Sequence, residues 1–566
     1  MKKFILIAFL PVYIFAQSDG QSQSIELPDF VITGRQKVEL PVMKKSKAEP
    51  VSILSKEFFF PSFTTDQFSL ATVSKPTQLI ADILPNEQNY KAQVILGAGN
   101  YTLPTGEFYF SEQFGTGKFY SKLWGTNQRD YVDYADFNIS GINAGSEFYI
   151  NRHSSFLPGS ILNLNASFVR REYKYFSEYR VNHFLPPSTR ETQLAEANLS
   201  LENYFDDNFK YNFKFGGDYL DIKDAGAKEM NYQFEGNTRI KLDNFGLLIG
   251  GKFHNQIVDK SIKENYKFYK LSGGIEYHLN SDLLLRAGAA YYNADLKDYF
   301  VDGSLPRFRN KSEDLITPWG EVQYNINNLL VLTARYNPYA EFKTYKDFLN
   351  ENPYTHILQV EEYNGSLYAF DNNMKIYKQN VEFSLKFGFK KYYEFTIGGR
   401  YAKIDNAYFY NPDFSFDNTP GYTERFFVSN FDNVTEYSVF ATALYHLGPF
   451  GWFYGDAKYQ VVEEDRFSKI LPYHPKFSLE AAYGYKFNFG LSAQVKINYM
   501  KDIYADYWNN FLLDDYINLS TELRYSLNQN FDLTLHLNNL LNRDNYLWLG
   551  YVESPFDFKA GIDFRF

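Results

Sequence analysis

The sequence has no cysteine and only 8 histidines among its 566 residues. Without cysteine the chain can form no disulfide framework, no thiolate metal site and no lipoprotein attachment. The histidines stand singly between His153 and His536, and no His-Glu-x-x-His motif, Gly-x-Ser-x-Gly elbow or glycine-rich phosphate loop occurs. The formal net charge of -10 offers no basic face to a nucleic acid. We expect no metal, no cofactor and no enzymatic activity, although a catalytic site assembled from distant residues stays open.

Long apolar runs are also missing. The run 4–15 is shorter than the roughly 20 residues that a membrane-spanning helix needs, so we expect no helical anchor. Lys2 and Lys3 precede this run and Ala16 follows it, which is typical of a secretory signal peptide. We expect residues 1–16 to be removed near Ala16 and the mature chain to be exported.

Aromatic side chains are abundant. They make up 19% of the residues and are mainly phenylalanine and tyrosine, at 55 and 49. The mean hydropathy is nevertheless polar, at -0.41, whereas a soluble core this aromatic would also be rich in leucine, isoleucine and valine. A transmembrane β-barrel accounts for both values, because its outer face is apolar, its lumen is polar and aromatic girdles lie at both interfaces.

From about Lys91 to the end, apolar and polar side chains alternate with a period of two, most clearly over 491–499, 517–526 and 531–538. Strands with this pattern place one face in lipid and the other in a wet interior. The interior face carries both signs of charge, as in Asp456 and Lys458, so we expect a lumen that holds water and selects solutes by charge. Pairing across strands is the alternative for any single one of these residues.

The connections favour a barrel over a sandwich. Short polar turns are expected at 206–208, 243–244, 280–282, 325–328, 447–449 and 528–530, and long aromatic connections at 171–190, 295–313, 341–373, 405–432 and 542–555. Strict alternation of short and long connections is typical of an up-and-down barrel. We predict an all-β fold over 91–566, a transmembrane antiparallel up-and-down β-barrel of about 22 strands with short periplasmic turns and long extracellular loops, placed in the outer membrane.

The last strand carries a terminal signal. The side chains that share its apolar face are Phe558, Ile562, Phe564 and Phe566. A closing strand that ends on an aromatic residue resembles the signal by which the barrel-assembly machinery recognises outer-membrane barrels. An ordinary amphipathic strand is the alternative.

Two segments resemble TonB-dependent outer-membrane receptors. In the last hundred residues, Leu471–Pro475 precedes a strand, Asn538–Arg543 forms an asparagine-leucine turn before an aromatic connection, and Gly561–Phe566 closes the chain. Behind the signal peptide, a short stretch is similar to the TonB box and consists of Asp29, Phe30, Val31, Ile32, Thr33 and Gly34. The resemblance implies a barrel of 22 strands and a segment that pairs with TonB by strand addition. A simple extended linker is the alternative for that stretch.

The region before the barrel departs from this family. Its members carry a plug domain of more than a hundred residues, whereas 17–90 lacks the alternation and includes a linker-like stretch at 36–50. The resemblance therefore covers the barrel, and it implies a periplasmic segment over 17–90 that is a missing or much reduced plug.

Two expected outer loops hold clusters of aromatic residues, which we expect to be exposed. The candidate ligand contacts are Tyr408, Tyr410, Phe414, Tyr422, Tyr546, Trp548 and Tyr551. Packing between loops and an interfacial girdle are the alternative for these rings.

Three functions follow from the sequence. The first is a TonB-dependent, receptor-like transporter of an unidentified ligand, with outer-membrane lipid, TonB, the barrel-assembly machinery and a surface lipoprotein as partners. The second is a passive or partner-gated channel. The third is a surface adhesion scaffold, which would carry no flux.

Overall fold

The computed structural model describes residues 90–566, apart from 152, 156, 180–185, 204–207, 260–262, 303–304, 357–359, 364–365, 370–373, 390–392, 413–424 and 447–450. The chain divides into two units, Met1–Gln67 and Phe68–Phe566, and every described residue belongs to the second. The expected signal peptide, the TonB-box-like stretch Asp29–Gly34 and the linker lie outside the described residues, so they stay predictions.

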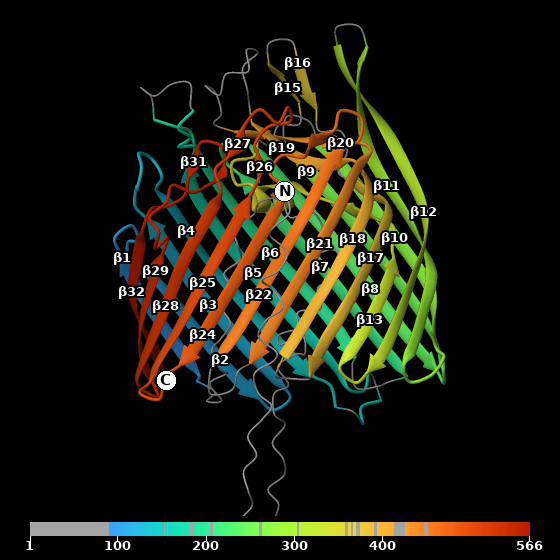
Figure 1. Ribbon diagram of the computed structural model, residues 1–566, viewed down its shortest axis with the longest axis horizontal. Helices are drawn as coiled ribbons and strands as arrows, with labels where there is room; N and C mark the ends of the chain where they lie inside the picture. Colours follow the sequence, from blue (N-terminus) through green and yellow to red (C-terminus); the bar gives the residue numbers. More distant parts are fainter. Residues whose placement is uncertain are drawn as a thin grey trace, which may run out of the picture. The chain divides into compact units, whose positions relative to one another are not determined.

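The described residues form a closed antiparallel barrel of 22 strands, which confirms the predicted fold class and strand number (Figure 1). Its first twelve strands are β1 (Ala92–Gly99), β2 (Thr105–Phe114), β3 (Gly117–Gln128), β4 (Phe137–Tyr149), β5 (Ser160–Lys174), β6 (Thr189–Asn203), β7 (Phe209–Ile222), β8 (Ala227–Leu242), β9 (Phe245–Asp259), β10 (Lys263–His278), β11 (Leu283–Asp302) and β12 (Leu305–Asn327). The other ten are β13 (Leu330–Tyr336), β17 (Met374–Phe389), β18 (Tyr393–Asp405), β21 (Val434–His446), β22 (Trp452–Glu464), β24 (Phe477–Lys486), β25 (Leu491–Lys501), β28 (Tyr516–Asn528), β29 (Phe531–Asn538) and β32 (Asp557–Arg565). Each strand pairs with its neighbours in the chain, and β1 pairs with β32 to close the ring.

Smaller elements extend or connect these strands. Two short strands lengthen the wall: β14 (Tyr339–Phe342) pairs with β17, and β23 (Lys469–Ile470) pairs with β22. The connections hold a short helix, α2 (Tyr345–Glu351), and the pairs β15 (Val360–Tyr363) with β16 (Ser366–Ala369), β19 (Ala407–Pro412) with β20 (Phe426–Phe431), β26 (Ile503–Tyr504) with β27 (Leu512–Leu513) and β30 (Tyr546–Trp548) with β31 (Tyr551–Val552). In the part of the chain that the structure describes, no helix has the length and apolar character needed to cross a membrane.

The outer face of the barrel is apolar, as the alternation predicts. On β10 the side chains of Leu271 and Ile275 are 63% and 57% exposed, whereas those of Phe268 and Glu276, on the opposite face, are buried. The same pattern places Ile249, Phe383 and Val439 outside on other strands. A closed sheet with an apolar exterior satisfies all its backbone groups internally and faces lipid without penalty.

Phe383 allows a test of this orientation, because it lies near the middle of β17 and is 51% exposed. We expect Phe383→Arg to lower the free energy of unfolding in lipid vesicles by about 2–4 kcal/mol, the cost of a cation at the bilayer midplane. Ser384→Arg is the control, because Ser384 faces the lumen. Urea unfolding in vesicles measures both, and equal effects would contradict the orientation.

The connections at the two ends of the barrel differ in length. The short turns expected at 243–244, 280–282, 325–328 and 528–530 are confirmed at one end. Strict alternation was wrong, because several connections at the opposite end are also short. For example, β9 ends at Asp259 and β10 begins at Lys263, and only 223–226 join β7 to β8. Gly226 has a φ of 57°, which allows this tight turn. We call the end with the long connections the mouth.

The connection predicted at 295–313 was also wrong. The β11–β12 ladder continues up to the pair Asp302 and Leu305, and the two strands rise beyond the rest of the wall (Figure 1). Outside the lipid, neither face of a two-stranded ribbon has to be apolar, so the sequence shows no alternation there and was predicted to be a loop.

The wall also changes direction at β13. Its pairing with β12 stops at Gly320 and Tyr336. If the register continued, Pro318 would face Pro338, and neither residue has an N–H group to donate to a ladder. β14 pairs instead with β17 alone, and its Phe342 is buried. The two prolines thus end the ladder with β12, and the chain continues along the wall paired with β17 alone before it turns into the lumen after Phe342.

Candidate functional site at the barrel mouth

The helix α2 follows β14 and begins with a capping box. The Asp347 N–H donates to the Thr344 hydroxyl at 3.2 Å, and the Thr344 N–H donates to the Asp347 carboxylate at 2.8 Å. A helix of seven residues is not stable by itself, so packing must hold it. Its buried side chains, Tyr345, Phe348 and Leu349, supply that packing.

Three carboxylates on the lumen face bind the first turn of α2. The Lys346 ammonium lies 2.7 Å from the Asp218 carboxylate on β7 and 3.1 Å from Glu196 on β6. The Tyr345 N–H donates to the Glu229 carboxylate on β8 at 2.8 Å. Burial acts to lower the pKa of Lys346, but Asp218 and Glu196 outweigh it and raise that pKa above its ordinary value. Lys346 therefore stays charged and anchors the helix.

The chain after α2 reaches β5 and β6. Arg171 donates to the Asn350 side chain at 2.9 Å, the Tyr173 hydroxyl to the Pro353 carbonyl at 2.5 Å, and Arg190 to the Thr355 carbonyl at 3.2 Å. Residues 343–356, which we call the crossing segment, thus run from β14 to the wall formed by β5–β8. This segment was not predicted from the sequence, although Thr344-x-x-Asp347 is a helix-start signal.

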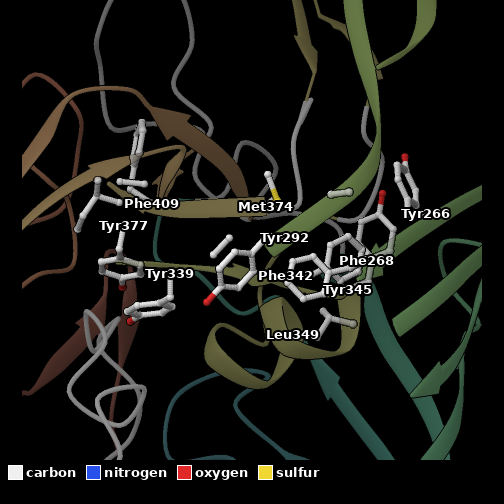
Figure 2. Packing of buried hydrophobic residues seen from close by; sticks show 14 of the residues in the cluster. Tyr266, Phe268, Tyr292, Tyr339, Phe342, Tyr345, Leu349, Met374, Tyr377 and Phe409 are labelled. Carbon is white, nitrogen blue, oxygen red and sulfur yellow. The ribbon is translucent and has the colours of Figure 1, made fainter. Parts of the chain in front are cut away.

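The crossing segment packs on an apolar cluster inside the mouth (Figure 2). Phe342 stacks on Phe268 with ring centroids 5.9 Å apart, and Tyr339 stacks on Tyr377 at 4.3 Å. Leu349 of α2 belongs to the same cluster. The expectation of a polar lumen was therefore wrong near the mouth, because an inward connection needs apolar partners on the wall.

A second cluster lies among the long connections, and we call it the aromatic cap. Its buried members are Phe348, Tyr408, Tyr410, Phe426, Tyr473, Met500, Ile503, Ala505, Leu513, Tyr516, Leu547, Trp548, Leu549 and Tyr551. The Trp548 ring lies 5.3 Å from Tyr410, 5.4 Å from Phe426 and 4.5 Å from Tyr473, centroid to centroid. Connections far apart in sequence thus pack into one body.

The aromatic cap changes the interpretation of the candidate ligand contacts. Tyr408, Tyr410, Trp548 and Tyr551 are buried, so the expected exposure of these four rings was wrong. Tyr546 is partly buried, and Phe414 and Tyr422 lie outside the described residues. The rings bury one another because each connection is too short to form a core alone. Contact of these residues with a ligand stays a prediction.

His474 lies between β23 and β24 and is buried. Its Nδ1 lies 2.7 Å from the Pro472 carbonyl oxygen. Burial, together with the charges of Lys375 and Lys458, lowers the pKa of His474 to about 4. The imidazole is therefore neutral at neutral pH.

We expect acidification to destabilise this connection. The unfolded chain takes up a proton at His474 near pH 6.5 and the folded chain only near pH 4, so the unfolded state binds more protons between these values. The stability present above pH 6.5 is lost as the pH falls, by about 3 kcal/mol in all. Urea unfolding of wild type and His474→Gln at neutral pH and at pH 4.5 measures this contribution. An identical pH dependence of the two proteins would contradict it.

Towards the end with short turns, the lumen face carries alternating charges. Arg286 lies 2.7 Å from both Glu276 and Glu321, and Arg335 lies 2.8 Å from Glu321. Arg239 on β8 also pairs with Glu276. Charges of both signs thus face the lumen, as predicted, and here they form cross-strand ion pairs. Selection of solutes by these charges stays a prediction. Among the described residues, no group of histidine, aspartate and glutamate is arranged to hold a metal.

The terminal strand lies where the alternation places it. The outer face of β32 exposes Phe558, Ile562 and Phe564, and the terminal Phe566 is also exposed. On the lumen side, Arg565 lies 2.6 Å from Asp563. Recognition of this strand by the assembly machinery stays a prediction.

The fold and the apolar exterior define the class of protein, a transmembrane β-barrel. No protein-family model matches the sequence, and no curated protein matches it. Among solved structures, the FrpB iron transporter from Neisseria meningitidis (F3-3 variant) has a TM-score of 0.64 at 12% identity, over 85% of this chain and 82% of that chain. The siderophore receptor PiuA from Acinetobacter baumannii has a TM-score of 0.63 at 11% identity, over 85% and 82%.

The copper transporter OprC is a third similar structure, with a TM-score of 0.61 at 13% identity over 84% of this chain and 80% of that chain. All three are transporters or receptors, and none is an enzyme. Identities this low establish a shared fold. The chain therefore has the 22-strand barrel fold of TonB-dependent receptors, which confirms the sequence resemblance at the level of the fold.

Proposed function

We propose that this chain is an outer-membrane receptor that imports a ligand through its barrel with energy transmitted by TonB. The observation that carries the proposal is a wide barrel of receptor fold whose mouth contains the crossing segment and the aromatic cap. A barrel of 22 strands has a lumen too wide for wall side chains to fill, so an open one would leak. Connections that pack across the mouth suit a receptor that opens for its ligand. The similar structures, an iron transporter, a siderophore receptor and a copper transporter, support this function.

The proposal assigns roles to segments outside the described residues. Asp29–Gly34 pairs with TonB as an added strand, with Val31 and Ile32 fixing the register. Residues 1–16 are a signal peptide cleaved near Ala16, and 17–90 is a reduced plug. The barrel-assembly machinery inserts the chain through its last strand, and a surface lipoprotein is a partner at the mouth.

Two measurements on the mature chain test the proposal. We expect the periplasmic domain of TonB to bind the chain that starts at Gln17 and not the variant lacking 29–34. In planar bilayers we expect the same full chain to be silent. Equal binding of TonB by both proteins, or a large steady conductance of the full chain, would rule out the receptor.

A passive or partner-gated channel is the second candidate, and the crossing segment favours it. A connection held inside the mouth by fixed ion pairs narrows a pore without any plug. This candidate predicts steady conductance of the full chain, no effect of deleting 29–34, and selectivity that changes with the charge of Lys346.

A further inference from the structure

A hollow of about 340 Å³ lies in the lumen wall near the short-turn end, away from the mouth. Its lumen-facing lining residues come from β7, β8, β9, β10 and β12. A hollow of this size is within the range of small-ligand pockets. The proposed function assigns no role to it.

Strand register arranges the lining in two rows across the wall. In the first row, Asn212 pairs with Asn237, Asn237 with Gly250, and Gly250 with Ser272. Directly beside it, the second row consists of Lys210, Arg239, Leu248, Gly274, Gly288 and Trp319, each paired with the next. The first row is polar, and the second carries two cations and ends on an indole ring.

Two glycines shape the position of Trp319. A Cβ atom at Gly274 would lie 2.3 Å from the Trp319 ring, and one at Gly288 would lie 2.5 Å from it. Since no real Cβ atom approaches so closely, only glycine at these two positions lets the indole lie against the wall. The ring therefore leans across β11 and β10 towards the hollow.

A third glycine, Gly250, forms the floor between two polar groups. A Cβ atom at Gly250 would lie 2.6 Å from the Ser272 hydroxyl and 2.8 Å from the Asn237 side-chain oxygen. The Asn237 amide nitrogen donates to Glu235 at 3.0 Å, which leaves its oxygen turned towards Gly250 as an acceptor. A hydroxyl and an amide oxygen therefore converge on space that any other residue at 250 would fill.

We propose that this hollow binds a sugar ring, and that the imported ligand is a carbohydrate. Vicinal sugar hydroxyls donate to and accept from groups such as Asn237 and Ser272. The C–H groups on one face of a pyranose carry partial positive charge, which the negative face of an indole such as Trp319 attracts. Lys210 and Arg239, which also pairs with Glu276, add positive charge at the rim. The assignment as cargo rests on the proposed function, whereas the binding itself does not.

The test measures binding by the purified full mature chain. Isothermal titration uses free trisaccharides of glucose, mannose, galactose and N-acetylglucosamine, with catechol as the flat aromatic probe. We expect at least one trisaccharide to bind, and Trp319→Ala and Gly250→Val to weaken it tenfold or more. Gly399→Val is the matched control, because a Cβ there meets only the Ser438 carbonyl at an ordinary 3.5 Å.

Every outcome decides the proposal. Failure of all four trisaccharides to bind overturns it, as does binding that Gly250→Val leaves unchanged. Catechol binding that depends on Trp319, without sugar binding, assigns the hollow to flat aromatic ligands and overturns the carbohydrate. Sugar binding by a chain that fails the TonB test keeps the site and rejects the proposed function.

Discussion

Lys346→Met is expected to detach the crossing segment from the wall and to expose the mouth of the lumen. The change leaves Asp218 and Glu196 with no partner in α2 and removes an ammonium that both carboxylates contact. Breaking such a buried pair from one side costs about 3–5 kcal/mol, because a carboxylate stays desolvated without compensation. The docked form of the segment should therefore lose most of its population.

The absence of cysteine makes this expectation directly measurable. A single cysteine at Leu349, which is buried in α2, should react with a maleimide slowly in the parent chain. We expect the reaction to be about a hundredfold faster or more with Lys346→Met, in line with the lost free energy. Lys346→Arg keeps the charge and should stay slow, and Lys378→Met removes an exposed cation near the mouth without effect. Equal rates in the parent and Lys346→Met would show that Lys346 does not hold the segment.

Trp548→Ala is expected to open the aromatic cap. Its indole is buried and contacts Tyr410, Phe426 and Tyr473. Replacing a buried tryptophan by alanine costs about 3–5 kcal/mol through lost burial and the cavity left behind. Because these contacts lie in the connections, the loss should fall on the cap and leave the barrel wall folded.

A cysteine at the buried Leu547 reports on the cap in the same way. We expect Trp548→Ala to speed its labelling at least tenfold while heat-resistant migration of the folded barrel on gels is unchanged. Trp508→Ala is the matched control, because Trp508 is 51% exposed in a neighbouring connection. If Trp508→Ala and Trp548→Ala had the same effect, burial in the cap would not be the cause.

Opening of the mouth also separates the two candidate functions. In a receptor, Lys346→Met and Trp548→Ala should change ligand access while any plug at 17–90 still prevents steady conductance. In a passive channel, release of the crossing segment should raise conductance at once. The two variants therefore belong in the bilayer experiment beside the full chain.

Local patterns explain which predictions succeeded. The period-two alternation around Leu271 and Phe383 reflects the burial of one face of each strand. That burial does not depend on which strand is the neighbour, as long as the neighbour has the same pattern. Turns such as Asp243-Asn244 depend on a few adjacent residues, and Asp243 has the positive φ that such turns need. The strand number followed from counting these turns.

The errors share a different cause. The β11–β12 ribbon leaves the lipid, so its residues carry no alternation although they still pair. The sequence predicted exposed rings for Tyr410 and Trp548, because no residue near either of them in sequence indicates that the two rings will cover each other. The sequence around Lys346 does not indicate its ion pairs, because its partners Asp218 and Glu196 lie more than a hundred residues earlier.

The sequence by itself determined the barrel, its apolar exterior and its strand number, because each depends on periodicity and composition along a single strand or turn. Tertiary structure alone decided that 343–356 enters the mouth, that the aromatic connections form a cap, and that Gly250 and Trp319 shape one hollow. Those features depend on contacts between residues distant in the chain, and only closure of the sheet brings such residues together.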